Sequence, residues 1–85
     1  MRTNLEPVLQ NLINRMPSSD RVLLATIRAG ITRRWVRQKD IQREARVKAQ
    51  YLCDVLHGRR KVSKRMAAVF RGIINDKIWP KVANA

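Results

Sequence analysis

QKDIQREARVKAQYLCDVLHGRRKVS, residues 38–63, combines many Lys and Arg with a regular apolar pattern. Arg46 and Val47 interrupt that pattern, which predicts two short helices joined by a tight turn. The first begins somewhere between residues 32 and 37, and the second ends at Gly58, because glycine readily adopts the left-handed conformation that closes a helix. The recurring apolar residues of this stretch are Ile41 and Ala45 in the first helix, Val47 in the turn, and Leu52, Val55 and Leu56 in the second helix.

Two further helices are expected before this segment. An amphipathic helix starts at Pro7 and stops at Pro17, because proline fits the first turn of a helix but cannot continue one. A second helix covers about residues 20–29, after capping residues at 18–20, and Gly30 is expected to close it in a left-handed conformation.

One helix is expected after the segment. Ser63 caps its start, and Pro80 ends ordered helix, with a short tail at 80–85. Its apolar stripe consists of Met66, Val69, Phe70, Ile73 and Ile74. The alternation typical of strands does not occur. The sequence therefore predicts an all-α fold, a compact bundle of about five short helices.

Length and charge narrow the class of protein. The chain has 85 residues, enough for one small domain, and 45% of them are hydrophobic, too many for a disordered basic tail. Lys and Arg number 19 against 6 Asp and Glu, which gives a net charge of +13. Such a surplus favours an anionic partner, either nucleic acid or an acidic membrane surface.

Several other classes are not expected. Cys53 and His57 are the only residues of their types, so neither an internal disulfide nor a Cys/His zinc site can form. Carboxylates are not paired at a spacing useful for catalysis, so we expect a non-enzyme without metal or cofactor. The first 16 residues lack a continuous apolar run, which indicates no secretion signal or membrane span and favours a reducing cytoplasm.

The two central helices resemble the helix-turn-helix of the lambda-repressor and Cro (XRE-type) family. Gln38 opens the first helix, Ile41 and Ala45 fill its buried positions, and Val47 occupies the apolar turn position. The ending GRRKVS is similar to the family's link into its next helix. In this family the second helix of the motif reads the DNA bases. The family's aromatic and core positions on that helix correspond to Tyr51, Leu52, Val55 and Leu56. The resemblance covers about residues 20–79 and is specific over 38–63, and it implies a helix-turn-helix domain over residues 18–79. The amphipathic helix predicted within residues 1–17 precedes that domain.

The chain departs from the family pattern near the turn. Arg46 replaces the usual glycine, Lys48 replaces a Ser or Thr cap, and Gln42 replaces a small residue. The lead-in ITRRWVR is also longer than usual. Arg46 is expected to adopt a conformation that costs about 1 kcal/mol more than it costs glycine.

Positive charge is concentrated on this motif, which supports nucleic-acid binding. From Arg28 to Arg65 the sequence has 13 Lys and Arg and 3 acidic residues. A helix that enters the major groove reads bases through its N-terminal turns. The base-reading candidates are therefore Lys48, Ala49, Gln50, Cys53 and Asp54.

Gln50 is the strongest of these candidates, because glutamine can form two hydrogen bonds with adenine. Lys48 can reach guanine or phosphate, and Ala49 is small enough to contact a thymine methyl group. The alternative for Gln50 is an ordinary exposed helix residue. Cys53 has a redox switch as its alternative role, and His57 is interpreted as a helix cap or a phosphate neighbour.

Another set of residues is expected to contact the DNA backbone, which positions the protein without choosing sequence. Gln38 resembles the family's first-helix glutamine, which braces the backbone contact. Arg65 follows the reading helix and is also expected to meet phosphate. The residues expected to contact the DNA backbone are Gln38, Lys39, Arg43, Tyr51, Arg59, Arg60, Lys61 and Lys64.

The resulting hypothesis is a phage or bacterial transcriptional regulator of Cro or repressor type, located in the nucleoid or the infected host. It would bind a two-fold-symmetric operator in double-stranded DNA as a homodimer. Two dimer surfaces remain open, one on the N-terminal helix and the other, which is favoured, on a C-terminal segment with Phe70, Ile74, Ile78 and Trp79. The alternatives are an antitoxin with a toxin partner and a less specific nucleic-acid-binding protein.

Overall fold

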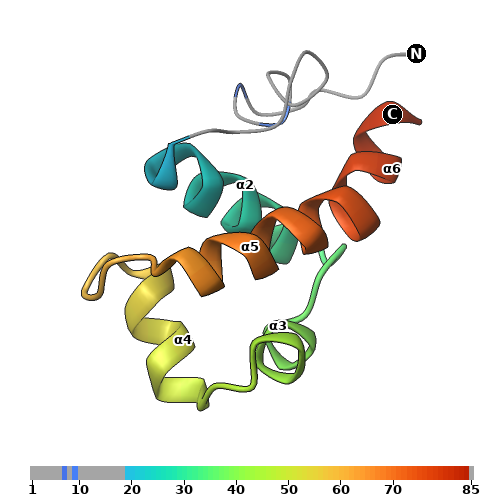
Figure 1. Cartoon of the computed structure of the whole chain (residues 1–85). Helices are drawn as coiled ribbons and strands as arrows, with labels where there is room; N and C mark the ends of the chain where they lie inside the picture. Colours follow the sequence, from blue (N-terminus) through green and yellow to red (C-terminus); the bar gives the residue numbers. More distant parts are fainter. Residues whose placement is uncertain (1–6, 8, 10–18, 85) are drawn as a thin grey trace.

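The computed structural model describes Pro7, Leu9 and residues 19–84, and these residues contain helices and turns but no strand (Figure 1). The prediction of a compact all-α fold is confirmed. The described residues form four principal helices, one fewer than expected, and most of the predicted N-terminal helix lies outside them. The principal helices are α2 (Asp20–Thr32), α3 (Gln38–Ala45), α4 (Ala49–Leu56) and α5 (Lys64–Ile73).

α5 lies across the middle of the molecule, with α2 on one side and α3 and α4 on the other (Figure 1). Each helix buries one apolar face against its neighbours. Phe70 of α5 is the largest fully buried side chain. Around it, α2 contributes Leu23 and Ile27, α3 contributes Ile41 and Ala45, and α4 contributes Leu52, Val55 and Leu56.

Two helices begin at the predicted serine caps. The Ser19 hydroxyl accepts a hydrogen bond of 3.2 Å from the Val22 backbone N–H and starts α2. The Ser63 hydroxyl accepts one of 3.1 Å from the Met66 N–H and starts α5. Each cap typically stabilises a helix by about 1 kcal/mol.

The predicted role of Gly30 is wrong, because α2 continues through Gly30 to Thr32. Gly30 is buried, and a Cβ at this position would lie 2.6 Å from Cδ1 of Ile78. Glycine therefore lets α2 approach the segment after α5. The left-handed residue beyond α2 is Arg34, with φ of 63°. α3 begins at Gln38, with Arg37 as its N-cap. Gln38 is the first helical residue that the family resemblance implies, and it lies one residue beyond the interval of 32–37 that the apolar pattern predicted.

Pro80 does not end ordered helix as predicted. After α5 the backbone adopts a π-helical segment, η1 (Ile74–Ile78), and then α6 (Trp79–Ala83). This change of hydrogen-bonding pattern places Pro80 in the first turn of α6, where its missing N–H is not needed. Val82 beyond it is buried in the core, so most of the expected tail is part of the fold.

Most residues of the favoured dimer surface lie inside a single chain. Phe70, Ile74 and Ile78 are fully buried within one chain, and Trp79 packs partly against the same core. The sequence pattern marked these residues correctly as apolar but did not show that α2 and the rest of the chain already cover them. The alternative surface on the N-terminal helix lies outside the described residues.

The turn between α3 and α4 contains the strained residue that was expected. Arg46 has φ of 56° and ψ of 48°, in the left-handed region. The Val47 N–H donates to the Gln42 carbonyl over 3.2 Å, which closes the end of α3. The guanidinium of Arg65 donates to the Ala45 carbonyl and caps the same helix end. Arg65 thus has a structural partner where a phosphate contact was expected.

Gly30→Ala should destabilise the protein by about 1 to 3 kcal/mol, because the new methyl group overlaps a buried side chain. Gly72→Ala in α5 is the matched control, since a Cβ there would meet nothing within 4 Å. That change should stabilise the protein by about 0.5 to 1 kcal/mol. Chemical denaturation of both variants measures the two changes, and equal effects would contradict the close packing of Gly30.

Arg46→Gly should raise the free energy of unfolding by about 0.5 to 1 kcal/mol, because glycine adopts the left-handed conformation without a Cβ clash. Arg43→Gly removes the same charge from the regular part of α3 and should lower stability by about 1 kcal/mol. Thermal melts of the two variants check the prediction. A loss of stability in Arg46→Gly would show that the side chain contributes more than its conformation costs.

Candidate nucleic-acid interface

α4 places its polar first turn on the surface. Its apolar side is buried in the core, and Figure 1 shows the helix at the periphery, joined to α3 by residues 46–48. Lys48, Ala49 and Gln50 are exposed, whereas Cys53 and Asp54 are half-buried. Three of the five predicted base-reading residues therefore lie at the exposed start of the helix, and two lie one turn further along.

The starts of α3 and α4 differ from those of α2 and α5. Arg37 is the N-cap of α3 and Lys48 is the N-cap of α4, and neither provides a side-chain hydrogen bond to its helix. Both basic residues stand at the positive end of a helix dipole, which is unfavourable for a cation. The first turn of α4 also lacks an acidic residue. This combination of free N–H groups and positive charge suits an anion.

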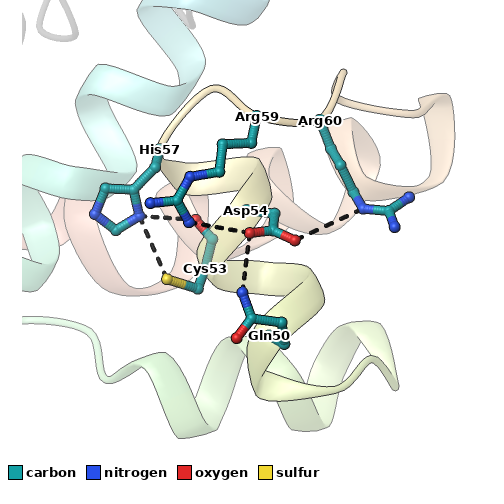
Figure 2. A network of polar contacts seen from close by, with 6 residues as sticks. All are labelled: Gln50, Cys53, Asp54, His57, Arg59 and Arg60. Carbon is teal, nitrogen blue, oxygen red and sulfur yellow. Dashed lines mark hydrogen bonds and ion pairs between the residues drawn. The ribbon is translucent and has the colours of Figure 1, made fainter.

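Asp54 is the centre of a polar network that joins α4 to the following loop (Figure 2). Its Oδ1 accepts hydrogen bonds from Gln50 Nε2 at 3.0 Å and from Arg59 Nη1 at 3.1 Å. Arg60 Nε lies 3.9 Å from Oδ2, within ion-pair distance. The Asp54 carbonyl also accepts from the backbone N–H groups of Arg59 and Arg60, at 2.8 and 3.3 Å. The side-chain carboxylate and the backbone carbonyl of Asp54 thus both hold the loop against the helix.

The network favours the ionised form of the Asp54 carboxyl. The hydrogen bond from Arg59 is the main cause that lowers the pKa of Asp54, and the bond from Gln50 and the charges of Arg59 and Arg60 act in the same direction. Desolvation opposes them by raising the pKa. An ionised carboxylate only accepts hydrogen bonds, so it fixes which atoms of its neighbours face it.

An open hollow lies beside this network. Arg60 stacks over the Tyr51 ring, with its guanidinium carbon 5.1 Å from the ring centroid. Tyr51 is half-buried, so it combines core packing with an exposed edge. The hollow is lined by Val47, Lys48, Gln50, Tyr51, Asp54 and Arg60. The structure therefore brings together the turn, the first turn of α4 and the basic loop.

Cys53 and His57 interact at the other end of the exposed face (Figure 2). His57 is the C-cap residue of α4, in agreement with its predicted capping role. Its Nδ1 lies 2.8 Å from the Cys53 carbonyl oxygen and 3.4 Å from Sγ. A hydrogen on Nδ1 would donate to this carbonyl, which can only accept.

The predicted backbone-contacting residues are divided between two regions. Lys39 and Arg43 are exposed on α3, and Lys61 and Lys64 are exposed around the loop after α4. Gln38 is the first residue of α3, but it shares a hollow with Leu56 and His57 at the end of α4 and with three residues of α2. The structure therefore does not bring Gln38 to the hollow that contains Gln50.

Two structural roles were not predicted from the sequence. Asp54 was interpreted as a base reader, although its separation of four residues from Gln50 on one helix is a recognisable signal for a side-chain pair. The contact of Arg65 with Ala45 joins residues 20 positions apart and has no local signal.

Comparison with known proteins leaves the family open, because no protein-family model, curated protein or solved structure matches the chain. Within residues 19–84, together with Pro7 and Leu9, the helices are too short or too polar to cross a membrane. The same residues contain no group of three or more His, Cys, Asp and Glu arranged to hold a metal ion.

Asp54→Asn should lower the melting temperature at neutral pH, because it removes the ionised acceptor of the network. The pKa of Asp54 is lower in the folded chain than in the unfolded chain, so its contribution is present above about pH 4 and disappears as the pH falls through the folded-state pKa. The difference in melting temperature between wild type and Asp54→Asn should therefore shrink on acidification. Thermal melts at several pH values measure it, and a difference independent of pH would contradict the network.

Proposed function

We propose that the protein is a sequence-specific DNA-binding transcriptional regulator of Cro or repressor type. In this proposal α3 and α4 form a helix-turn-helix, and α4 reads the major groove. The observation that carries the proposal is the start of α4, where a basic N-cap without a side-chain cap adjoins exposed Ala49 and Gln50. A DNA phosphate would satisfy the N–H groups and balance the charge of Lys48 in one contact.

The exposed residues supply the chemistry that base reading requires. The major groove is about 12 Å wide and admits an α-helix. Gln50 provides one acceptor and two donors, a set that pairs with adenine, and Ala49 can lie against a thymine methyl group. Lys48 is long enough to reach guanine or a phosphate. Cys53 and Asp54 are set back from this position by their partial burial.

The surrounding cations are suited to hold the backbone. Exposed Lys and Arg occur before α4, on α3, and after it, in the loop. Their contacts with phosphates release counterions and give binding that falls with salt. Arg59 and Arg60 remain useful for this purpose in the network, because a guanidinium has five N–H donors and Asp54 engages only part of them.

Two copies of the chain are proposed to bind one operator. A single helix of eight residues contacts only a few base pairs, which rarely gives enough affinity and specificity. Two copies related by a two-fold axis would read the two halves of a palindromic site. The affinity of the pair then depends on the spacing of the half-sites.

The direct test is selection of bound DNA from a random duplex pool, followed by sedimentation of the complex. The proposal predicts enrichment of a two-fold-symmetric site and a complex with two chains per duplex. If no sequence is enriched although the protein binds DNA, a less specific nucleic-acid-binding protein is the better description. If a symmetric site is enriched but each duplex binds one chain, the proposed homodimer is wrong, and sequence-specific binding by a single chain remains.

Gln50→Ala and Lys61→Ala should give two distinguishable phenotypes. Gln50→Ala should lose about 1 to 3 kcal/mol of binding free energy on the selected duplex, little on a scrambled one, and should leave the salt dependence nearly unchanged. Lys61→Ala should weaken both duplexes and reduce the slope of log K against log salt by about one unit. Titrations at several salt concentrations measure both. Equal losses on both duplexes for Gln50→Ala would refute the proposed reading face.

A further inference from the structure

The side-chain amide of Gln50 donates a hydrogen bond to the carboxylate of Asp54, one turn further along α4 (Figure 2). A glutamine amide can be flipped, which exchanges its donor and acceptor ends and changes the base that it fits. An exposed glutamine in solution would sample both orientations. The contact with Asp54 therefore bears directly on which base edge Gln50 can recognise.

The carboxylate permits only one of the two amide orientations. An ionised carboxylate has no hydrogen to donate. If the side-chain oxygen of Gln50 faced it, two acceptor oxygens would repel each other. With the nitrogen facing Asp54 at 3.0 Å, one amide hydrogen is used. The other hydrogen and the carbonyl oxygen remain for DNA. This donor and acceptor together match the N7 and N6 groups of adenine, whereas guanine presents two acceptors at the same edge.

Asp54 is itself held in place. Arg59 shares the same carboxylate oxygen, Arg60 faces the other, and both backbone N–H groups of these arginines bind the Asp54 carbonyl. The side chain is only 20% exposed, whereas the Arg59 and Arg60 side chains are 62% and 59% exposed. The acceptor for Gln50 is therefore fixed by the loop, and the arginines keep exposed surface for phosphate.

We propose that Asp54 is a positioning residue that sets the base preference of α4, by holding the Gln50 amide in the orientation that selects adenine over guanine. The proposal rests on the proposed function, because it assumes that Gln50 reaches a base edge. It assigns Asp54 a role through Gln50 and not a base contact of its own.

The first experiment needs no DNA and tests the contact in the free protein. The side-chain amide signals of Gln50 are followed by NMR while the pH is lowered through the ionisation of Asp54. The proposal predicts that these signals shift with the same midpoint as the Asp54 carboxyl, and that the shift is absent in Asp54→Asn. Gln50 signals that do not respond to Asp54 in the wild type would overturn the proposal, whatever the stability of the variant.

The second experiment measures base preference on the duplex selected from the random pool. Each base pair of the site is replaced in turn, and the pair whose discrimination disappears in Gln50→Ala identifies the position that Gln50 reads. We expect an A·T pair there, with guanine in place of adenine weakening wild-type binding by about tenfold. Asp54→Asn should reduce that discrimination by about threefold or more, because a neutral amide at 54 accepts either orientation of Gln50.

Asp76→Asn is the matched control, since it removes the same charge from η1, on a different part of the fold from α4. Asp76→Asn should keep the full discrimination between adenine and guanine. It should share any general gain in DNA affinity that comes from removing a negative charge that repels phosphate. Full discrimination in a folded Asp54→Asn, a G·C pair at the Gln50 position, or no Gln50-dependent pair in an enriched site would each overturn the role of Asp54. Each of these results would leave sequence-specific DNA binding by the protein standing. Absence of any enriched site would instead remove the proposed function and this inference together.

Discussion

Burial of one side of α4 is the constraint on which the candidate interface depends. A helix of eight residues without a side-chain cap is too short to persist in water by itself. It persists here because Leu52, Val55 and Leu56 are buried against the core around Phe70. The same burial fixes the rotation of the helix about its axis, so that Ala49 and Gln50 are exposed. The core therefore positions the surface that we propose reads DNA.

Local conflicts with ordinary helix chemistry gather around α3 and α4. Arg46 is left-handed without being glycine, and Arg37 and Lys48 place positive charge at helix N-termini. α2 and α5 begin at serine caps, although α5 also has basic Lys64 and Arg65 in its first turn and Arg34 before α3 is left-handed. Sequences keep such conflicts mainly where function requires them. An anionic partner would turn the unfavourable N-terminal charges into favourable ones, which is why this concentration supports the proposed phosphate contacts.

Features with a local cause were predictable from the sequence, and features with a distant cause were not. The all-α fold and the serine caps follow from periodicity and neighbouring residues, and the left-handed Arg46 was expected from the family resemblance, which implies glycine at that position. The true role of Gly30 depends on Ile78, which is 48 positions away. The helix beyond Pro80 depends on a π-helical segment that no simple pattern marks. At the candidate site, exposure of Gln50 was predictable, but the engagement of Asp54 by the loop required the structure.

The most direct test of the central claim is an NMR titration of the protein with a short duplex at low salt, because electrostatic contact with DNA then does not depend on knowing the operator. The account predicts that backbone amide signals at the start of α4 and in the loop at 57–63 shift most. Signals of η1 and α6 should change little. The largest shifts on α6 or on the exposed side of α2, with α4 unchanged, would contradict the assignment of α4 as the DNA-binding helix.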